Sequence, residues 1–194
     1  GSRGLGHQVC SEHSRKFEQM YKRDGEKWYN ENWDFKIADR QLASAPFHSK
    51  EGQQYLEEMN AAANFAFANR SALAHRLREV LNLEMGKDGE ARVLYDVSHN
   101  IAKVENHIIH GQNCQCVVHR KGATRAFGGD QLELNSHFKA TGQPVLVPGD
   151  MGTGSWIMSG PVTGQNQAFG SSCHGAGRSL SRTKAKKTID GKEL

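Results

Sequence analysis

The spacing of the apolar residues changes along the chain, and this change limits the fold more than any other feature. From Ser49 to about Leu81, apolar residues recur at every third or fourth position, which is the spacing of one face of an α-helix. Ser49 is a favoured N-cap residue, and Glu51 lies in the first turn. After Gly86 and Gly89 the pattern becomes one of short strands. Helices followed by strands indicate an α+β fold, with mixed sheets and packed helices.

The apolar positions of the long helix predict its buried face, and the arginines predict its solvated face. The expected buried positions are Tyr55, Met59, Ala62, Ala66, Leu73, Leu77 and Val80 or Leu81. The expected solvated positions are Arg70, Arg76 and Arg78. A second helix is predicted over 8–23, ending at Asp24-Gly25 and followed by a loop over 26–48. Strands are predicted at 91–97, 115–119, 144–147 and 155–158, each followed by or flanking a polar motif.

The composition is that of a soluble globular protein. The chain has 194 residues, a formal net charge of +4 and 37% hydrophobic residues. No apolar run approaches the roughly 20 residues that span a membrane, and the start has no signal-peptide pattern. The cysteines lack the spacing of a secreted disulfide framework or a zinc pair, which favours reduced thiols and a cytoplasmic location. The abrupt first residues and lysine-rich end predict a fragment, the central-to-late part of one domain over 1–194.

One loop near the end of the chain combines an imidazole, small residues and a guanidinium. His174 is followed by Gly175, Ala176 and Gly177, which let a ligand approach the backbone closely. Arg178 then offers a fork of donors that matches phosphate oxygens. A neutral imidazole here can attack a phosphorus atom, bind a metal ion or act as a general acid. The same residues fit an ordinary glycine-rich turn with a surface histidine, so both interpretations stay open.

Other motifs have the small or cationic residues of a phosphate site. The segment 1–7 is glycine-rich and ends in His7, but it has neither the Walker A nor the dinucleotide GxGxxG spacing. His99 and Asn100 follow a predicted strand, while His107 and His110 are expected to be peripheral. The segment 120–125 places three cations around a glycine, and the turn 148–155 offers backbone donors and two hydroxyls. Each of these motifs also fits a plain turn or a basic loop.

The end of the chain is basic. Residues 178–194 carry six basic and two acidic side chains, which favours a nucleotide or a nucleic-acid backbone as partner. A solvated helix face is the alternative. A histidine-based metal hydrolase is disfavoured, because the chain has no HExxH or similar compact ligand set.

Five motifs, taken in order, closely resemble the RtcB family of RNA-splicing ligases. They are GSRGLGH at 1–7, DVSHNIA at 96–102, VHRKGATRA at 118–126, GQPVLVPGDMGT at 142–153 and CHGAGR at 173–178. The resemblance spans nearly all of this chain, but only a middle-to-late part of the family's longer enzyme. It implies a partial RtcB-like catalytic fold.

The resemblance also implies an activity. It implies a GTP- and manganese-dependent ligase that joins an RNA 3'-phosphate or 2',3'-cyclic phosphate end to a 5'-hydroxyl end, in tRNA splicing or RNA repair. His174 would attack the α-phosphate of GTP and carry GMP, which passes to the RNA 3'-phosphate before the 5'-hydroxyl displaces it. The implied partners are tRNA halves or broken RNA, GTP and an accessory activating protein. An inactive fragment that only binds nucleotide or RNA is the alternative.

Individual residues receive roles from the same resemblance. Two match manganese ligands: His7 and His99. Those that match positions at the GTP site are His99, Asn100, Pro148, Gly149, Asp150, Met151, Ser155, His174, Gly175, Ala176 and Gly177. Those expected to contact RNA or phosphate are Arg178, Arg182, Arg120, Lys121 and Arg125.

The chain departs from the family pattern at a few places. Asp150 stands where the family often has Ser, and its carboxylate is unfavourable beside a triphosphate unless it faces away or helps hold the metal. The family's upstream Asp and Cys metal ligands, its Asn-His segment and its guanine-contacting Lys have no counterpart here. We therefore expect the isolated chain to bind metal weakly and to ligate poorly or not at all.

Overall fold

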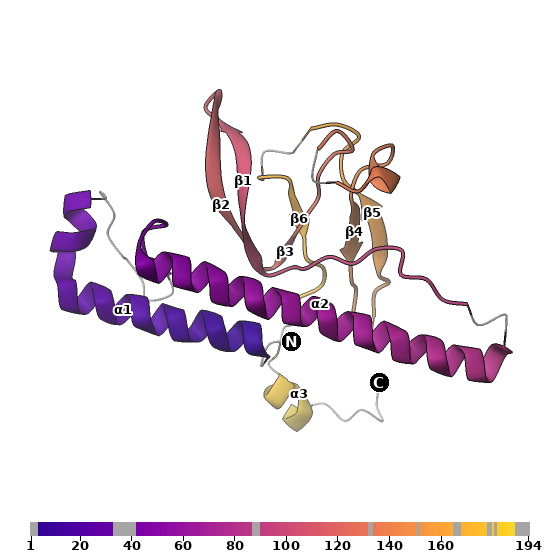
Figure 1. The fold of residues 1–194 in the computed structure, drawn as a ribbon. Coiled ribbons are helices and arrows are strands. Elements are labelled where there is room, and N and C mark those ends of the chain that lie inside the picture. Colours follow the sequence, from indigo (N-terminus) through magenta and orange to yellow (C-terminus); the bar gives the residue numbers. More distant parts are fainter. Residues whose placement is uncertain are drawn as a thin grey trace. The chain divides into compact units, whose positions relative to one another are not determined.

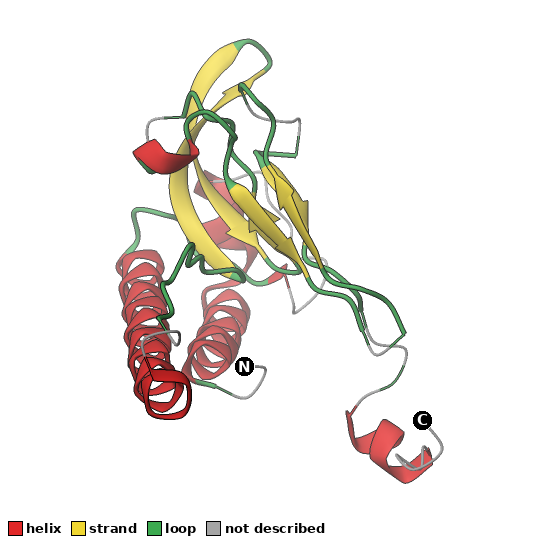
Figure 2. Ribbon diagram, turned by 90° about the vertical axis from the view of Figure 1, so that its right-hand side faces the viewer, coloured by secondary structure: helices red, strands yellow, loops and turns green. Residues whose placement is uncertain are grey.

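The computed structural model describes residues 4–32, 42–86, 90–131, 134–150, 152–164, 168–177, 180 and 182–188, and for 25–32, 182 and 186 it describes the backbone alone. The elements follow in the order α1 (Leu5–Asn32), α2 (Lys50–Met85), β1 (Ile101–Ile109), β2 (Gln112–Arg120), β3 (Ala123–Arg125), the 3-10 helix η3 (Ser136–Phe138), β4 (Pro144–Val147), β5 (Trp156–Ser159), β6 (Ser171–Cys173) and α3 (Arg182–Thr188) (Figure 1). Helices and small sheets together confirm the expected α+β class (Figure 2).

The chain divides into two compact units. The first is Gly1–Ala102 and contains α1 and α2, and the second is Lys103–Leu194 and contains nearly all of the strand structure. Among the described residues the strands form two-stranded sheets that pair β1 with β2, β3 with β6 and β4 with β5. The expectation that 1–194 is part of one domain stays a prediction. No described helix has the length and apolar character needed to cross a membrane.

Helices α1 and α2 pack through apolar side chains in the first unit. The buried ones include Val9, Phe17, Met20, Met59 and Ala62. The rings of Phe17 and Tyr55 meet edge to face, with centroids 6.1 Å apart. A large apolar side chain such as Phe17 contributes about 1.5–3 kcal/mol when it is fully buried. These contacts hold the two helices together.

The start and end of α2 follow the sequence expectation. Ser49 accepts a hydrogen bond from the Gly52 N–H at 3.1 Å and donates one to the Pro46 carbonyl at 2.7 Å. Gly86, at φ +60°, ends the helix with its N–H bonded to the Asn82 carbonyl. The side-chain cap satisfies one of the backbone donors that every helix start leaves open. The predicted N-cap is therefore confirmed.

The predicted buried face of α2 is right for the first half of the helix only. Met59 and Ala62 are buried, but Leu73, Leu77 and Val80 are 60%, 55% and 54% exposed. The polar contacts with α1 also lie in the first half, where Lys16 bonds Gln54 and His13 bonds Glu58. Because α1 lies along that half (Figure 1), the later apolar residues of α2 have no part of α1 to pack against.

Two local predictions were wrong. Helix α1 continues to Asn32, past the stop predicted at Asp24-Gly25, because a glycine inside a helix costs only about 1 kcal/mol. The segment 91–97 forms no strand in the described structure. It is attached to α2 instead, since Arg70 bonds the Asp96 carboxylate at 2.6 Å and Arg78 bonds the Ala91 carbonyl at 2.8 Å.

The other strand predictions agree with the structure more closely. The predicted strand at 115–119 lies within β2, the one at 144–147 is β4, and the one at 155–158 is shifted by one residue from β5. Strands β1, β3 and β6 were not predicted. Buried Gln143 connects the second unit internally, because its side chain accepts from the Phe127 N–H at 3.0 Å and its carbonyl from the Gly160 N–H at 2.8 Å.

We predict that Gly52→Ala destabilises the protein. A Cβ at Gly52 would lie 3.2 Å from the Phe47 carbonyl oxygen and closer still to that of Pro46. We expect a loss of about 1–3 kcal/mol, as for other overpacked sites, measured by urea unfolding. Gly6→Ala is the matched helical control, because a Cβ added there would meet nothing within 4 Å. Equal stability of the two variants would contradict the close approach at Gly52.

We also predict that Glu58 contributes to the loss of stability in acid. Hydrogen bonds from His13 and Gln54 lower the pKa of Glu58 below its ordinary value. A lowered folded-state pKa gives stability that is present above the unfolded pKa, about 4.3, and is lost as the pH falls through the folded one. Glu58→Gln should therefore lose less stability than the native protein between about pH 5 and pH 3, measured by urea unfolding across that range. An unchanged pH dependence would show that these bonds do not matter.

Candidate functional site

The backbone that leads to His174 is fixed by a short antiparallel ladder. Strands β3 and β6 pair so that Ala123 lies opposite Cys173 and Arg125 opposite Ser171. His174 follows Cys173 directly and is half-buried. The ladder thus brings the predicted basic segment at 120–125 beside the start of the histidine loop, residues 174–177. Sequence spacing alone did not place these two segments together.

The histidine loop also lies against the turn at 148–155. This turn connects β4 and β5, which pair with Val147 opposite Trp156. The Ala176 N–H donates to the Pro148 carbonyl at 2.9 Å. A Cβ at Gly175 would lie 2.8 Å from the Pro148 Cδ and 2.9 Å from its nitrogen. Since Gly175 also has φ +124°, only glycine fits this contact, and it holds two of the predicted nucleotide motifs together.

Asp150 folds back on its own turn. Its Oδ1 accepts from the Gly152 N–H at 2.8 Å and from the Thr153 hydroxyl at 3.0 Å. These bonds, led by the one from the Gly152 backbone, lower the pKa of the Asp150 carboxyl. The Asp150 carboxylate thus stabilises its own turn, a role that the sequence did not predict.

The backbone donors of this turn are largely used within it. The Gly149 N–H donates to the Ser155 hydroxyl at 3.1 Å, and the Asp150 N–H donates to the Thr153 hydroxyl at 3.1 Å. The Gly152 N–H is bound to Asp150, as described above. A phosphate that used these three donors would have to replace existing bonds. These three N–H groups are therefore already used within the turn.

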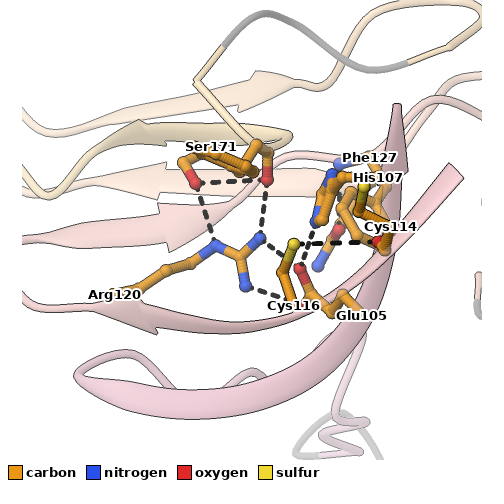
Figure 3. A network of polar contacts seen from close by, with 9 residues as sticks. Glu105, His107, Cys114, Cys116, Arg120, Phe127 and Ser171 are labelled. Atoms are coloured by element: carbon orange, nitrogen blue, oxygen red, sulfur yellow. Dashed lines mark hydrogen bonds and ion pairs between the residues drawn. The ribbon is translucent and has the colours of Figure 1, made fainter. Parts of the chain in front are cut away.

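Arg120 is buried, whereas a residue that contacts RNA is expected at the surface. It is only 4% exposed, and two of its nitrogens each bond one oxygen of buried Glu105 at 2.8 Å (Figure 3). Its remaining contacts are the Ser171 hydroxyl at 2.9 Å and the Phe169 carbonyl at 2.7 Å. An RNA phosphate could reach this guanidinium only by breaking these bonds. The structure gives Arg120 an internal role, which corrects the sequence expectation.

The other predicted phosphate contacts differ in how far the structure describes them. Lys121 is exposed, and the guanidinium of Arg125 lies 4.7 Å from the centre of the Phe127 ring. Arg182 is the first residue of α3, and its side chain is not described. Arg178 and Met151 lie outside the described residues. Lys121 and Arg125 stay candidates for meeting an anion.

The predicted metal ligands lie in the first unit. His7 is exposed in the first turn of α1, and His99 is exposed just before β1. Asn100 follows it at φ +54°, a left-handed conformation that asparagine tolerates better than most residues. Within the described ranges no group of three or more His, Cys, Asp or Glu side chains is placed to hold a metal ion. The two imidazoles do not complete a manganese centre with other described residues.

Two residues of the second unit were missed or misplaced by sequence reasoning. Glu105 was not considered, and His107 was expected to be peripheral, yet both are 6% exposed. His107 bonds the Glu105 carboxylate at 3.0 Å, and its ring centre lies 5.1 Å from that of Phe169. No clear signal in the sequence pointed to this pair, because β1 was not predicted, and a carboxylate that the fold buries needs a cation as partner. That cation is Arg120.

Comparison with known proteins identifies the family of the chain. Residues 1–194 match the family described as tRNA-splicing ligase RtcB. Proteins named tRNA-splicing ligase RtcB from Methanococcus maripaludis, Methanocaldococcus jannaschii and Thermococcus kodakarensis are 48%, 47% and 46% identical to the whole chain. The chain spans 39%, 19% and 39% of their lengths. A match over the full chain shows that it belongs to the tRNA-splicing ligase RtcB family.

Proposed function

We propose that the native protein carrying this chain joins RNA ends, and that His174 is its nucleotide-carrying nucleophile. The observation that supports this proposal most is that Gly175 and Ala176 contact Pro148 in the turn at 148–155. This contact fixes the backbone of the two small residues that follow His174, and small residues let a ligand approach the backbone closely. Because the chain spans 39% or less of the relatives compared, the reaction belongs to the longer protein.

The proposed reaction has three steps. A ring nitrogen of neutral His174 attacks the α-phosphorus of GTP, a P–N bond forms, and pyrophosphate leaves with the electrons of the broken P–O bond. An oxygen of the RNA 3'-phosphate then attacks the same phosphorus and breaks the P–N bond, which frees the imidazole. The RNA 5'-hydroxyl finally attacks the activated 3'-phosphate, loses its proton and displaces GMP. A 2',3'-cyclic end enters after its ring is opened by water.

The residues around His174 have separable tasks in this proposal. Gly175, Ala176 and Gly177 leave room for the nucleotide, with Pro148 and Gly149 forming the neighbouring wall. Asn100 and Ser155 would offer polar contacts to GTP, and His99, Asp150 and Met151 belong to the same proposed set. The phosphates of RNA would meet cations, and the candidates are Lys121, Arg125, Arg178 and Arg182.

Manganese is proposed as the cofactor. His7 and His99 would supply two ligands, and imidazole is a suitable donor for such an ion. When bound, the ion neutralises charge on the transferring phosphate. Further ligands would have to come from outside the described residues, because those residues hold no set of three.

A second candidate is nucleotide or RNA binding without turnover by the isolated chain. It is favoured by the same shortage of metal donors among the described residues and by the 39% of the relatives' length that the chain spans. An accessory activating protein is a further proposed partner of the native protein.

We predict that incubation of the native protein with GTP labelled at the α-phosphate and Mn²⁺ leaves acid-labile, base-stable label on the protein. His174→Ala should abolish the label, because it removes the nucleophile. His137→Ala changes an exposed histidine of η3 in the same unit and should keep the label. Label that survives in His174→Ala contradicts the assignment of the nucleophile, and an unlabelled native protein contradicts the ligase proposal. Label on the native protein but not on the isolated chain shows that the isolated chain lacks turnover, and retention of GTP or RNA by it in a binding assay then supports the second candidate.

We also predict that Gly175→Ala lowers the labelling rate at least about tenfold, since a displacement of about 1 Å costs this much or more. Its Cβ would overlap the Pro148 backbone, and its φ of +124° is unfavourable for alanine. The labelling rate is followed together with urea unfolding. Gly154→Ala is the control for stability, because a Cβ there would meet nothing within 4 Å. A native labelling rate in Gly175→Ala would show that this contact does not shape the site.

A further inference from the structure

We propose that Arg120 is a positioning residue that sets the place of His174 by holding the turn at 169–171. The inference rests on the proposed role of His174 as nucleophile. Arg120 does not touch the reacting atoms in this account. It acts through Phe169 and Ser171, which come just before His174 in the chain.

One side of the Arg120 guanidinium is held by a buried carboxylate. Both oxygens of Glu105 accept from it at 2.8 Å, and the two side chains are only 3% and 5% exposed. Burial acts to raise the pKa of Glu105, but hydrogen bonds from Arg120 and His107 outweigh it, so the net pKa is lowered. The carboxylate is therefore ionised near neutral pH. A bidentate pair of this kind fixes the plane of the guanidinium.

The other side of the guanidinium reaches the segment before the nucleophile. Its Nε donates to the Ser171 hydroxyl at 2.9 Å, and a terminal nitrogen donates to the Phe169 carbonyl at 2.7 Å. Figure 3 shows Ser171 on one side of the guanidinium and Glu105 on the other. Ser171 is the first residue of β6, the strand that ends immediately before His174. One side chain thus connects the buried part of β1 to the start of β6.

The turn that Arg120 holds is unfavourable by itself. Phe169 has φ +55°, a left-handed conformation that costs a non-glycine residue about 1 kcal/mol or more. The next residue, Gly170, has φ +57°, and its carbonyl accepts from the Ala126 N–H at 2.7 Å. The Phe169 ring also contacts His107. A strained turn persists only when its surroundings fix it, and Arg120 supplies one of those bonds.

Loss of Arg120 should therefore move His174 as well as weaken the fold. Without its bond to Phe169, the turn can relax toward an ordinary conformation, and the start of β6 moves with it. Downstream, the histidine loop stays in contact with Pro148 through Ala176. The residues between the start of β6 and Ala176, which include His174, should therefore be displaced. Nucleophile placement matters on this scale, because about 1 Å of misplacement can cost about a hundredfold in rate.

The experiment separates positioning from stability by removing both members of the ion pair. Arg120→Met takes the guanidinium away from the buried Glu105 carboxylate, which keeps its bond to His107, and should destabilise the native protein. Combining Arg120→Met with Glu105→Gln removes that charge, which restores much of the stability. The bonds to Ser171 and Phe169 stay lost in the double variant. Ser171→Ala removes the Nε bond alone, and Lys139→Met changes an exposed cation of the same unit as control.

The measured quantities are the rate of GMP attachment to His174 at saturating GTP, the KM for GTP and the midpoint of urea unfolding. We expect the double variant to recover stability but to label at least about tenfold more slowly than the native protein, with KM changed less than about twofold. Ser171→Ala should slow labelling by a smaller factor at native stability. Lys139→Met should match the native protein.

The outcomes distinguish this inference from the proposed function. A double variant that labels at the native rate overturns the positioning role, and so does Ser171→Ala if it has no effect on rate. If Arg120→Met does not fold, the double variant and Ser171→Ala decide the question by the same criteria. A native protein without label overturns the proposed function, and this inference falls with it.

Discussion

The buried ion pair between Glu105 and Arg120 is the interaction on which the second unit depends most. It joins β1 to the end of β2 and, through Ser171 and Phe169, to the start of β6. Breaking such a pair by removing one partner costs far more than the pair contributes relative to apolar residues, because a buried charge is left without compensation. The pair therefore contributes mainly by fixing geometry: the Arg120 guanidinium bonds the Glu105 carboxylate, the Ser171 hydroxyl and the Phe169 carbonyl at the same time.

That geometry meets a second constraint at the other end of the histidine loop. Gly175 lies so close to Pro148 that no side chain fits between them, and the Ala176 N–H bonds the Pro148 carbonyl. His174 therefore stands between an anchored strand and an anchored loop. In the proposed reaction His174 forms and releases a covalent bond to phosphorus, and a fixed placement would remove part of the entropic barrier to these steps.

Some of this could be predicted from the sequence, and the limits have physical reasons. The Ser49 cap and the α+β class follow from local patterns, which the sequence shows directly. The pairing of β3 with β6 depends on contacts between residues about fifty positions apart, and neither strand is long enough to show a period. Arg120 was expected at the surface because its neighbours are basic and small. Its burial depends on its bond to Glu105, fifteen positions earlier, and no local sequence pattern connects these two residues.

The central claim is that His174 carries GMP, and tandem mass spectrometry of the native protein tests it most directly. After incubation with GTP and Mn²⁺, the peptide that contains His174 should gain the mass of one GMP, and fragmentation should place it on the imidazole. The same peptide from a sample without GTP should be unmodified. Absence of the adduct, or its location on a lysine instead of His174, would contradict the account.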